Sequence, residues 1–291
     1  MSPSPQHIHF LGICGTAMGS IAAAMRDRGF KVTGQDENVY PPMSTFLESK
    51  GVEITSGFRP EDIPSADLIV IGNAMSRGNP AVEAVLNRKL LYLSLPETLK
   101  QFFLRGRHNL VVTGTHGKTT TTSLLAWIFE SAGEAPGYLI GGIPSNLGQG
   151  ACLRDSKHFI IEGDEYDTAF FDKRSKFIHY LPELVIVNNV EFDHADIYSN
   201  LEEIKTSFRR LLNIVPSEGM VLINGDDANS IDVAAKCHAP VVGVGFSENC
   251  ANQIRRVVHS AEGSSFELFG ETFFVPLSGD FNIRNAAMAA S

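Results

Sequence analysis

The sequence predicts an α/β fold with two domains, each built on a mainly parallel sheet. The length of 291 residues suits two domains of roughly 150 residues each. In addition, a short apolar run leads through glycines into a helical pattern at two places, 7–28 and 109–129. Strand–turn–helix units of this kind build open parallel sheets. We therefore expect domains at 1–107 and 108–291.

The first domain begins with a βαβ pattern. Strands are expected at 7–11 and 31–36, joined by a glycine turn at 12–19 and a helix that ends at Gly29. A helix N-terminus after such a turn can receive a diphosphate, and an acid at the end of the second strand can accept a hydrogen bond from a ribose hydroxyl. The candidate residues are Gly12, Cys14, Gly15, Thr16 and Asp36.

The turn departs from the dinucleotide fingerprint GxGxxG. Cys14 stands at its second glycine and Ala17 at its third, which disfavours a nicotinamide dinucleotide. A diphosphate remains compatible with the turn. The alternative is that the turn only stabilises the fold and that Asp36 is an exposed acid.

The α/β pattern continues to the end of the first domain. Helices are expected at 43–50 and 80–88, and strands at 52–55, 67–74 and 90–95, with a linker at 105–108. Ala74, Met75 and Ser76 lie at the carboxyl end of an apolar strand, where open α/β sheets bind ligands. A plain turn of small residues is the alternative there.

The second domain begins with a phosphate-binding pattern. An apolar strand ends in the loop 113–120, and a helix follows that is expected to stop at Gly133. Glycines let the backbone approach phosphate, and a Lys and a Thr of such loops contact phosphate and Mg²⁺. Val112 stands where the longer form of the motif has Gly. The candidate nucleotide-binding residues are Gly114, Thr115, His116, Gly117, Lys118, Thr119 and Thr120.

Two further strands, around 159–165 and 184–194, end in acids beside this loop. Mg²⁺ takes oxygen ligands from one or two carboxylates together with phosphates. We expect Glu162 and His194 to be linked to the metal with Thr119, and Asp193 to orient His194. With Lys118, Glu162 and His194 form the expected catalytic set, although a structural histidine is the alternative for His194.

The rest of the second domain predicts a loop, more parallel elements and an antiparallel addition. The glycine-rich stretch 137–150 predicts a long loop. A helix is expected at 201–214, parallel strands at 220–227 and 241–246, antiparallel strands at 255–259, 265–268 and 272–275, and a last helix from Asn282.

Composition excludes several classes of function. The net charge of −9 and the lack of a basic run argue against a nucleic-acid partner. The four cysteines show no CxxC spacing, which favours reduced thiols. The start of the chain has no leader pattern, and no apolar stretch has the ~18 residues of a membrane span. We expect a cytoplasmic protein without a membrane partner, and a monomer is favoured.

Four segments resemble the Mur ligases, ATP-dependent amide-forming enzymes of bacterial peptidoglycan assembly. They are similar to the short P-loop of that family, its magnesium acid motif, its Asp-His segment and the HNxxN stretch that contacts adenine, and they lie at 113–120, 162–165, 191–196 and 281–285. The resemblance implies ATP and Mg²⁺ as cofactors, adenine contacts by Asn282 and Asn285, and a first domain that binds a UDP substrate. Phe281 stands where the family usually has His.

Within the family, one branch is the most similar. Segments 12–16, 40–44, 72–80 and 165–174 resemble the enzymes that join UDP-N-acetylmuramate to the recycled murein tripeptide L-alanyl-γ-D-glutamyl-meso-diaminopimelate. UDP-N-acetylmuramate–L-alanine ligase is the alternative, although it would favour GxGGxGM in the first loop. Two other classes are a nicotinamide dehydrogenase, which leaves the P-loop unexplained, and a nucleotide-sugar-binding module without ligase activity.

The resemblance also implies features that this sequence lacks. Family members have a C-terminal Rossmann-like domain that presents the amine, and the sequence ends at Ser291 before it. We expect this chain alone to bind the UDP substrate but not to form the amide. Several relatives carry a carbamylated lysine on the helix after the Asp-His motif. Lys205 does not match its expected position, so it receives no such role.

Overall fold

The computed structural model describes residues 6–193, 195 and 197–291. They pack as two compact units, which are described separately. The first comprises the residues up to Phe103 together with Asp167–Arg174, and the second comprises Leu104–Tyr166 and Ser175–Ser291. Packing therefore groups residues 104–107 and 167–174 differently from the expected domains 1–107 and 108–291, whose boundary stays a prediction.

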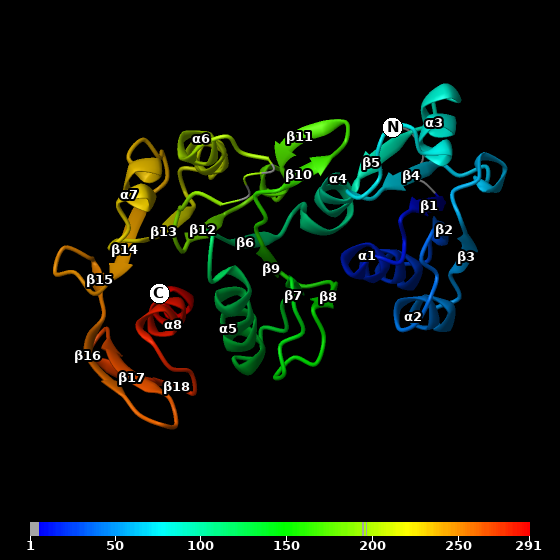
Figure 1. Cartoon of the computed structure of the whole chain (residues 1–291). Helices are drawn as coiled ribbons and strands as arrows, with labels where there is room; N and C mark the ends of the chain where they lie inside the picture. Colours follow the sequence, from blue (N-terminus) through cyan, green and yellow to red (C-terminus); the bar gives the residue numbers. More distant parts are fainter. Residues whose placement is uncertain (1–5, 194, 196) are drawn as a thin grey trace. The chain divides into compact units, whose positions relative to one another are not determined.

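The first unit is a five-stranded parallel sheet in the order β3-β2-β1-β4-β5, with α1 and α2 on one side and α3 on the other (Figure 1). Because β1 has β2 on one side and β4 on the other, the strand order reverses there. Ligands bind open sheets at such a point. The elements are β1 His7–Leu11, α1 Thr16–Asp27, β2 Lys31–Asp36, α2 Met43–Ser49, β3 Glu53–Ser56, η1 Pro60–Asp62, β4 Leu68–Ile71, α3 Pro80–Asn87, β5 Tyr92–Ser94, α4 Leu95–Leu99 and η2 Lys100–Leu104.

The end of the first unit differs from the strand expected at 90–95. Only Tyr92–Ser94 is a strand, and a short helix starts directly after it. Ser94 caps this helix: its hydroxyl accepts from the Glu97 amide, and the Glu97 carboxylate accepts from the Ser94 amide. This reciprocal capping ends the strand early.

A hairpin from the later sequence completes the first unit. It consists of β10 Asp167–Ala169 and β11 Asp172–Ser175, and it was not expected from the sequence. Phe170 and Phe171 at its tip pack against an apolar cluster that includes Ile71 and Met75. The Phe171 ring meets the Tyr92 ring edge to face at 4.9 Å. These aromatic contacts explain why the segment belongs with the first unit.

The second unit is an eight-stranded sheet in the order β15-β14-β13-β12-β6-β9-β7-β8, parallel except for β8. Helices α5 and α8 lie on one face and α6 and α7 on the other (Figure 1). The elements are β6 His108–Thr113, α5 Lys118–Ser131, β7 Gly137–Leu139, β8 Ala151–Cys152, β9 His158–Glu162, η3 Lys176–His179, β12 Leu184–Val187, α6 Leu201–Leu212, β13 Met220–Asn224, α7 Ala228–Ala234, β14 Val241–Gly245, β15 Asn252–Gln253, and α8 Asp280–Ala290.

The antiparallel addition is present as a three-stranded sheet of β16 Arg255–His259, β17 Ser264–Leu268 and β18 Glu271–Val275. The prediction of a loop at 137–150 is wrong at its start, because Gly137–Leu139 forms a strand that pairs with β9 and Tyr138 is buried. The α/β fold class with parallel sheets is confirmed. Among the described residues, no helix is long and apolar enough to cross a membrane.

Candidate functional site

The loop predicted to bind phosphate follows β6, the strand at which the order of the second sheet reverses. Gly117 is the N-cap of α5 and has φ +81°, and Gly114 has φ +132°. A Cβ atom on Gly117 would lie 2.6 Å from Asn285 Oδ1 and 2.9 Å from Asn188 Nδ2. The loop therefore requires glycine here for its backbone conformation and for space. The predicted residues 114–120 form one continuous turn and helix start.

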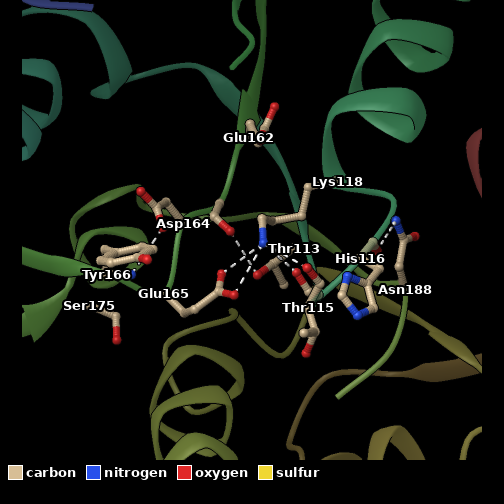
Figure 2. A network of polar contacts seen from close by, with 12 residues as sticks. Thr113, Thr115, His116, Lys118, Glu162, Asp164, Glu165, Tyr166, Ser175 and Asn188 are labelled. Carbon is tan, nitrogen blue, oxygen red and sulfur yellow. Dashed lines mark hydrogen bonds and ion pairs between the residues drawn. The ribbon is translucent and has the colours of Figure 1, made fainter. Parts of the chain in front are cut away.

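The turn is fixed from the neighbouring strand end, where Figure 2 shows Asn188 beside His116. Asn189, just after β12, accepts at its side-chain oxygen from the His116 amide at 2.8 Å and at its carbonyl from the Thr115 amide at 3.1 Å. The Asn188 side chain is buried and donates to the Thr121 hydroxyl at 3.0 Å. Neither asparagine was expected from the sequence. An amide pair at the end of an apolar strand beside a glycine loop would have been the pattern to look for.

Lys118 points back over the loop (Figure 2). Its ammonium donates to the carbonyls of Gly114 at 2.7 Å and Thr115 at 3.2 Å, and to Glu165 Oε1 at 3.1 Å. The Glu165 side chain is 3% exposed and that of Lys118 is 15% exposed. Glu165 is thus a second acid of the site; the sequence placed it in the acid motif 162–165 but predicted no contact with Lys118.

The predicted metal residues Thr119 and Glu162 lie together. Glu162 ends β9, and its Oε1 accepts from the Thr119 hydroxyl at 3.0 Å. Its Oε2 accepts from the Gly141 amide at 2.8 Å. No group of three or more His, Cys, Asp or Glu side chains that could hold a metal occurs in the described part of the chain. His194 lies outside the described residues, so its predicted role stays a prediction.

The last helix contributes to the same end of the sheet. Asn285 is buried and lies beside Gly117, since its side-chain oxygen would be 2.6 Å from a Cβ atom on that glycine. Asn282 donates from its side chain to the Ser278 carbonyl at 2.9 Å, one turn back. Of the two predicted adenine contacts, only Asn285 is thus placed against the loop. Lys205 on α6 pairs with Asp232 at 3.1 Å.

In the first unit, the residues predicted for the UDP substrate gather at the end of β1. Asp36 is buried, and its two oxygens accept from the amides of Cys14 at 2.8 Å and Asn38 at 2.9 Å. Gly15 is the N-cap of α1, and Thr16 begins that helix. Burial, with Asp36 close by, raises the pKa of the Cys14 thiol to about 11, so the thiol is protonated at neutral pH.

The loop after β4 also lies at the carboxyl end of β1. Met75 is buried, and a Cβ atom on Gly12, which has φ +83°, would lie 3.6 Å from its sulfur. Ala74 and Ser76 on either side of Met75 are exposed. The strand ends of β1, β2 and β4 therefore bring Gly12, Cys14, Asp36 and Met75 together, with Ala74 and Ser76 on the surface beside them.

Comparison with known proteins gives matches over nearly the whole chain. Residues 7–107 match the model described as Mur ligase family, catalytic domain, and residues 112–291 match the Mur ligase middle domain. A Haemophilus influenzae protein named UDP-N-acetylmuramate–L-alanyl-γ-D-glutamyl-meso-2,6-diaminoheptandioate ligase is 52% identical over 231 residues, which are 79% of this chain and 51% of that protein. The chain therefore spans about half the length of this relative.

Two further matches extend the comparison. A UDP-N-acetylmuramate–L-alanine ligase of Psychrobacter is 35% identical over 290 residues, which are 97% of this chain and 59% of that protein. The crystal structure of UDP-N-acetylmuramate:L-alanyl-γ-D-glutamyl-meso-diaminopimelate ligase from Neisseria meningitides has a TM-score of 0.89 and 44% identity, and the match covers 98% of this chain and 92% of that one. The Mur ligase middle domain model matches more than half of the residues of this chain, so the chain belongs to the Mur ligase family.

Proposed function

We propose that the protein is an ATP-dependent amide ligase that joins UDP-N-acetylmuramate to L-alanyl-γ-D-glutamyl-meso-diaminopimelate in peptidoglycan recycling. The observation that carries the proposal is the combination of a glycine loop, its Lys118 and the Thr119–Glu162 pair at one end of a parallel sheet. The names of the Haemophilus and Neisseria relatives support this choice of substrates.

The residues of the loop 114–120 fit a nucleoside triphosphate. The first amides of α5 have no partner within the helix and face the loop end, where an anion is favoured. Asn188 and Asn285 leave no room for a side chain on Gly117, so the loop depends on glycine for this conformation at the start of α5. Residues 114–120 would hold the phosphates of ATP, and Asn285, with Asn282, would lie toward the adenine.

The Thr119–Glu162 pair fits a magnesium ion. Hydroxyl and carboxylate oxygens are ligands that Mg²⁺ prefers, and it commonly uses one or two carboxylates plus phosphate oxygens. The hydrogen bond of 3.0 Å shows that the two oxygens can approach one centre. Bound magnesium would neutralise phosphate charge, and His194 is proposed as a further ligand.

The protein side of the reaction follows from charge. A carboxylate is a poor electrophile, so it must be activated as an acyl phosphate before an amine attacks. To form that species, a carboxylate oxygen attacks the terminal phosphorus of ATP and the bond to ADP breaks, so two anions must approach each other. Lys118 and the α5 N-terminus offset this repulsion and fix the phosphate in place. The amine of the tripeptide then attacks the acyl carbon, and phosphate leaves.

The first unit is proposed to bind the UDP part of the substrate. The α1 N-terminus at Gly15 and the loop from Gly12 to Thr16 are suited to the diphosphate. Asp36 already accepts from two backbone amides, and its oxygens keep further lone pairs that can accept from a hydroxyl. Ala74, Met75 and Ser76 complete the proposed contact region.

The test is a reaction with UDP-N-acetylmuramate, ATP, Mg²⁺ and either the tripeptide or L-alanine, run with a chain that includes the C-terminal domain expected for the family, because residues 1–291 alone are expected to bind the UDP substrate without forming the amide. Mass spectrometry identifies the product. UDP-N-acetylmuramoyl-tripeptide with the tripeptide only supports the proposal, and product with L-alanine only indicates the L-alanine ligase instead. UDP-ligand binding without any ATP hydrolysis or product would indicate a nucleotide-sugar-binding module. A Lys118→Ala variant serves as the inactive control.

A further inference from the structure

The ammonium of Lys118 is fully engaged within the second unit. An ammonium has three N–H groups and no acceptor. Among the described residues, its three partners are the carbonyls of Gly114 and Thr115 and the carboxylate of Glu165, at 2.7, 3.2 and 3.1 Å. A phosphate that binds Lys118 must therefore replace at least one of them.

Glu165 is held where it meets Lys118 (Figure 2). Its backbone carbonyl accepts from the Tyr198 hydroxyl at 2.7 Å, and that hydroxyl lies 3.1 Å from Ser175 Oγ. Its side chain is 3% exposed. A carboxylate this far from water interacts strongly with a neighbouring cation, because solvent screens the pair little. Of the three partners of Lys118, it is also the one with a full negative charge.

We propose that Glu165 is a positioning residue that acts through Lys118 by holding its ammonium against the loop until a triphosphate takes the ammonium over. The proposal rests on the proposed nucleotide binding by this loop. Glu165 and the incoming phosphates are both anions and compete for one cation. Glu165 therefore opposes nucleotide binding. When no nucleotide is bound, it holds the Lys118 ammonium against the loop.

The decisive variant is Glu165→Gln, which keeps the shape of the side chain and removes its charge. We expect calorimetric titration to give an ATP dissociation constant at least fivefold lower than that of the wild-type protein. The dissociation constant of UDP-N-acetylmuramate, whose proposed site lies in the first unit, should not change. A purely structural role of Glu165 would weaken ATP binding or leave it unaltered.

Asp164→Asn is the matched control. Asp164 precedes Glu165 in the same loop and forms an ion pair with Lys176 at 2.6 Å. This substitution removes the same charge next to the site but leaves the Lys118 pair intact. It should change the ATP dissociation constant by less than twofold. If both variants tighten ATP binding equally, the effect comes from net charge, and the proposal is wrong.

A second measurement needs no nucleotide. Lysines are acetylated with an amine-reactive ester, and the rate at Lys118 is followed by peptide mass spectrometry. Loss of its carboxylate partner should raise the Lys118 rate several-fold in Glu165→Gln and leave the Lys176 rate unchanged. Asp164→Asn should give the opposite pattern.

The outcomes separate the two proposals. If the wild-type protein does not bind ATP, the proposed function fails, and this inference fails with it. If wild-type and Glu165→Gln bind ATP equally well or the variant binds it less tightly, only the inference fails. Should Glu165→Gln not fold, Glu165→Asp replaces it, because this variant moves the carboxylate away from Lys118 by one methylene group. The ATP affinity and the Lys118 labelling rate should then change in the same direction but by a smaller factor.

Discussion

The Thr119 hydroxyl donates a 3.0 Å hydrogen bond to Glu162 Oε1, across 43 positions of sequence. The pair connects the first turn of α5 with the end of β9, because β6 and β9 are adjacent parallel strands with Val112 opposite Glu162. Two oxygen atoms that can ligate a metal thus come from different elements to one point beside the glycine loop. This arrangement favours a cation there more than either residue alone does.

Glu162→Gln should raise the Mg²⁺ concentration needed for half-maximal ATP-dependent activity by about 10-fold or more, the scale seen when a metal site loses a supporting group. The amide keeps the size of the side chain but has one oxygen instead of two. The measurement is a Mg²⁺ titration of activity at saturating ATP, in a chain that includes the C-terminal domain expected for the family. Glu183→Gln is the control, since Glu183 precedes β12 at the opposite end of the sheet. A wild-type titration curve for Glu162→Gln would make Glu162 a structural residue.

Asp36→Ala should weaken the binding of UDP-N-acetylmuramate by about 1–2 kcal/mol, the scale of a lost charge-assisted hydrogen bond. It also frees the amides of Cys14 and Asn38, so the loop after β1 loses its support. Calorimetric titration gives the change in affinity. Asp67→Ala is the matched control, because Asp67 accepts from the amides of Gln6 and His7 at the other end of β1. Equal losses in both variants would point to general destabilisation instead of a role in the site.

The glycine loops and the apolar strands could be predicted because their evidence is local. Gly114 and Gly117 lie directly between an apolar run and a helical pattern, so position in sequence and position in space coincide. The same holds for Glu162, the last residue of an apolar strand. Parallel strands carry their carboxyl ends to one edge, which is why these separate motifs meet.

Features that depend on distant pairing could not be predicted in this way. Glu165 lies three residues after Glu162, and nothing in the sequence says which of the two acids meets Lys118. The hairpin at 167–175 is mostly polar and short, and the packing of Phe170 and Phe171 in the first unit is a long-range contact. Gly137–Leu139 forms a strand despite its glycine-rich surroundings, because it pairs with the buried strand β9. Tertiary contacts override local preference at these places.

The stability of the first unit should depend on pH through His9. Burial lowers the pKa of His9 from 6.5 to about 4, and neighbouring His7 acts in the same direction. The unfolded chain therefore binds the proton more readily between these values. Stability from this group is complete above about pH 6.5 and is lost as the pH falls toward 4, by up to about 3 kcal/mol.

Urea unfolding of the wild-type protein and of His9→Gln across this pH range measures the effect. The variant should start less stable at pH 7, because it loses the hydrogen bond between His9 Nδ1 and the Thr33 hydroxyl at 2.8 Å. Its stability should then fall less steeply between pH 6.5 and 4. His238→Gln, at a histidine on the surface of the second unit, should reproduce the wild-type slope. Parallel curves for the wild type and His9→Gln would exclude His9 as the source of the dependence.

Gly117→Ala tests the loop with a control that the same helix provides. Gly117 and Gly133 lie at the two ends of α5, and both have φ +81°. A Cβ atom on Gly133 meets nothing within 4 Å, whereas on Gly117 it meets Asn285 at 2.6 Å and Asn188 at 2.9 Å. Both substitutions carry the same backbone cost, about 1–2 kcal/mol for a left-handed residue. The Gly117 variant alone also disturbs the site.

Gly117→Ala should therefore raise the ATP dissociation constant by about 10-fold or more, equivalent to about 1.4 kcal/mol, while Gly133→Ala should leave it within twofold of the wild type. Thermal unfolding without nucleotide should show a loss of stability in both variants, larger in Gly117→Ala because Asn188 and Asn285 must move. ATP titration by calorimetry, with circular dichroism to confirm folding, gives both numbers. Unchanged ATP affinity in a folded Gly117→Ala protein would mean that the phosphates do not approach the backbone at this glycine.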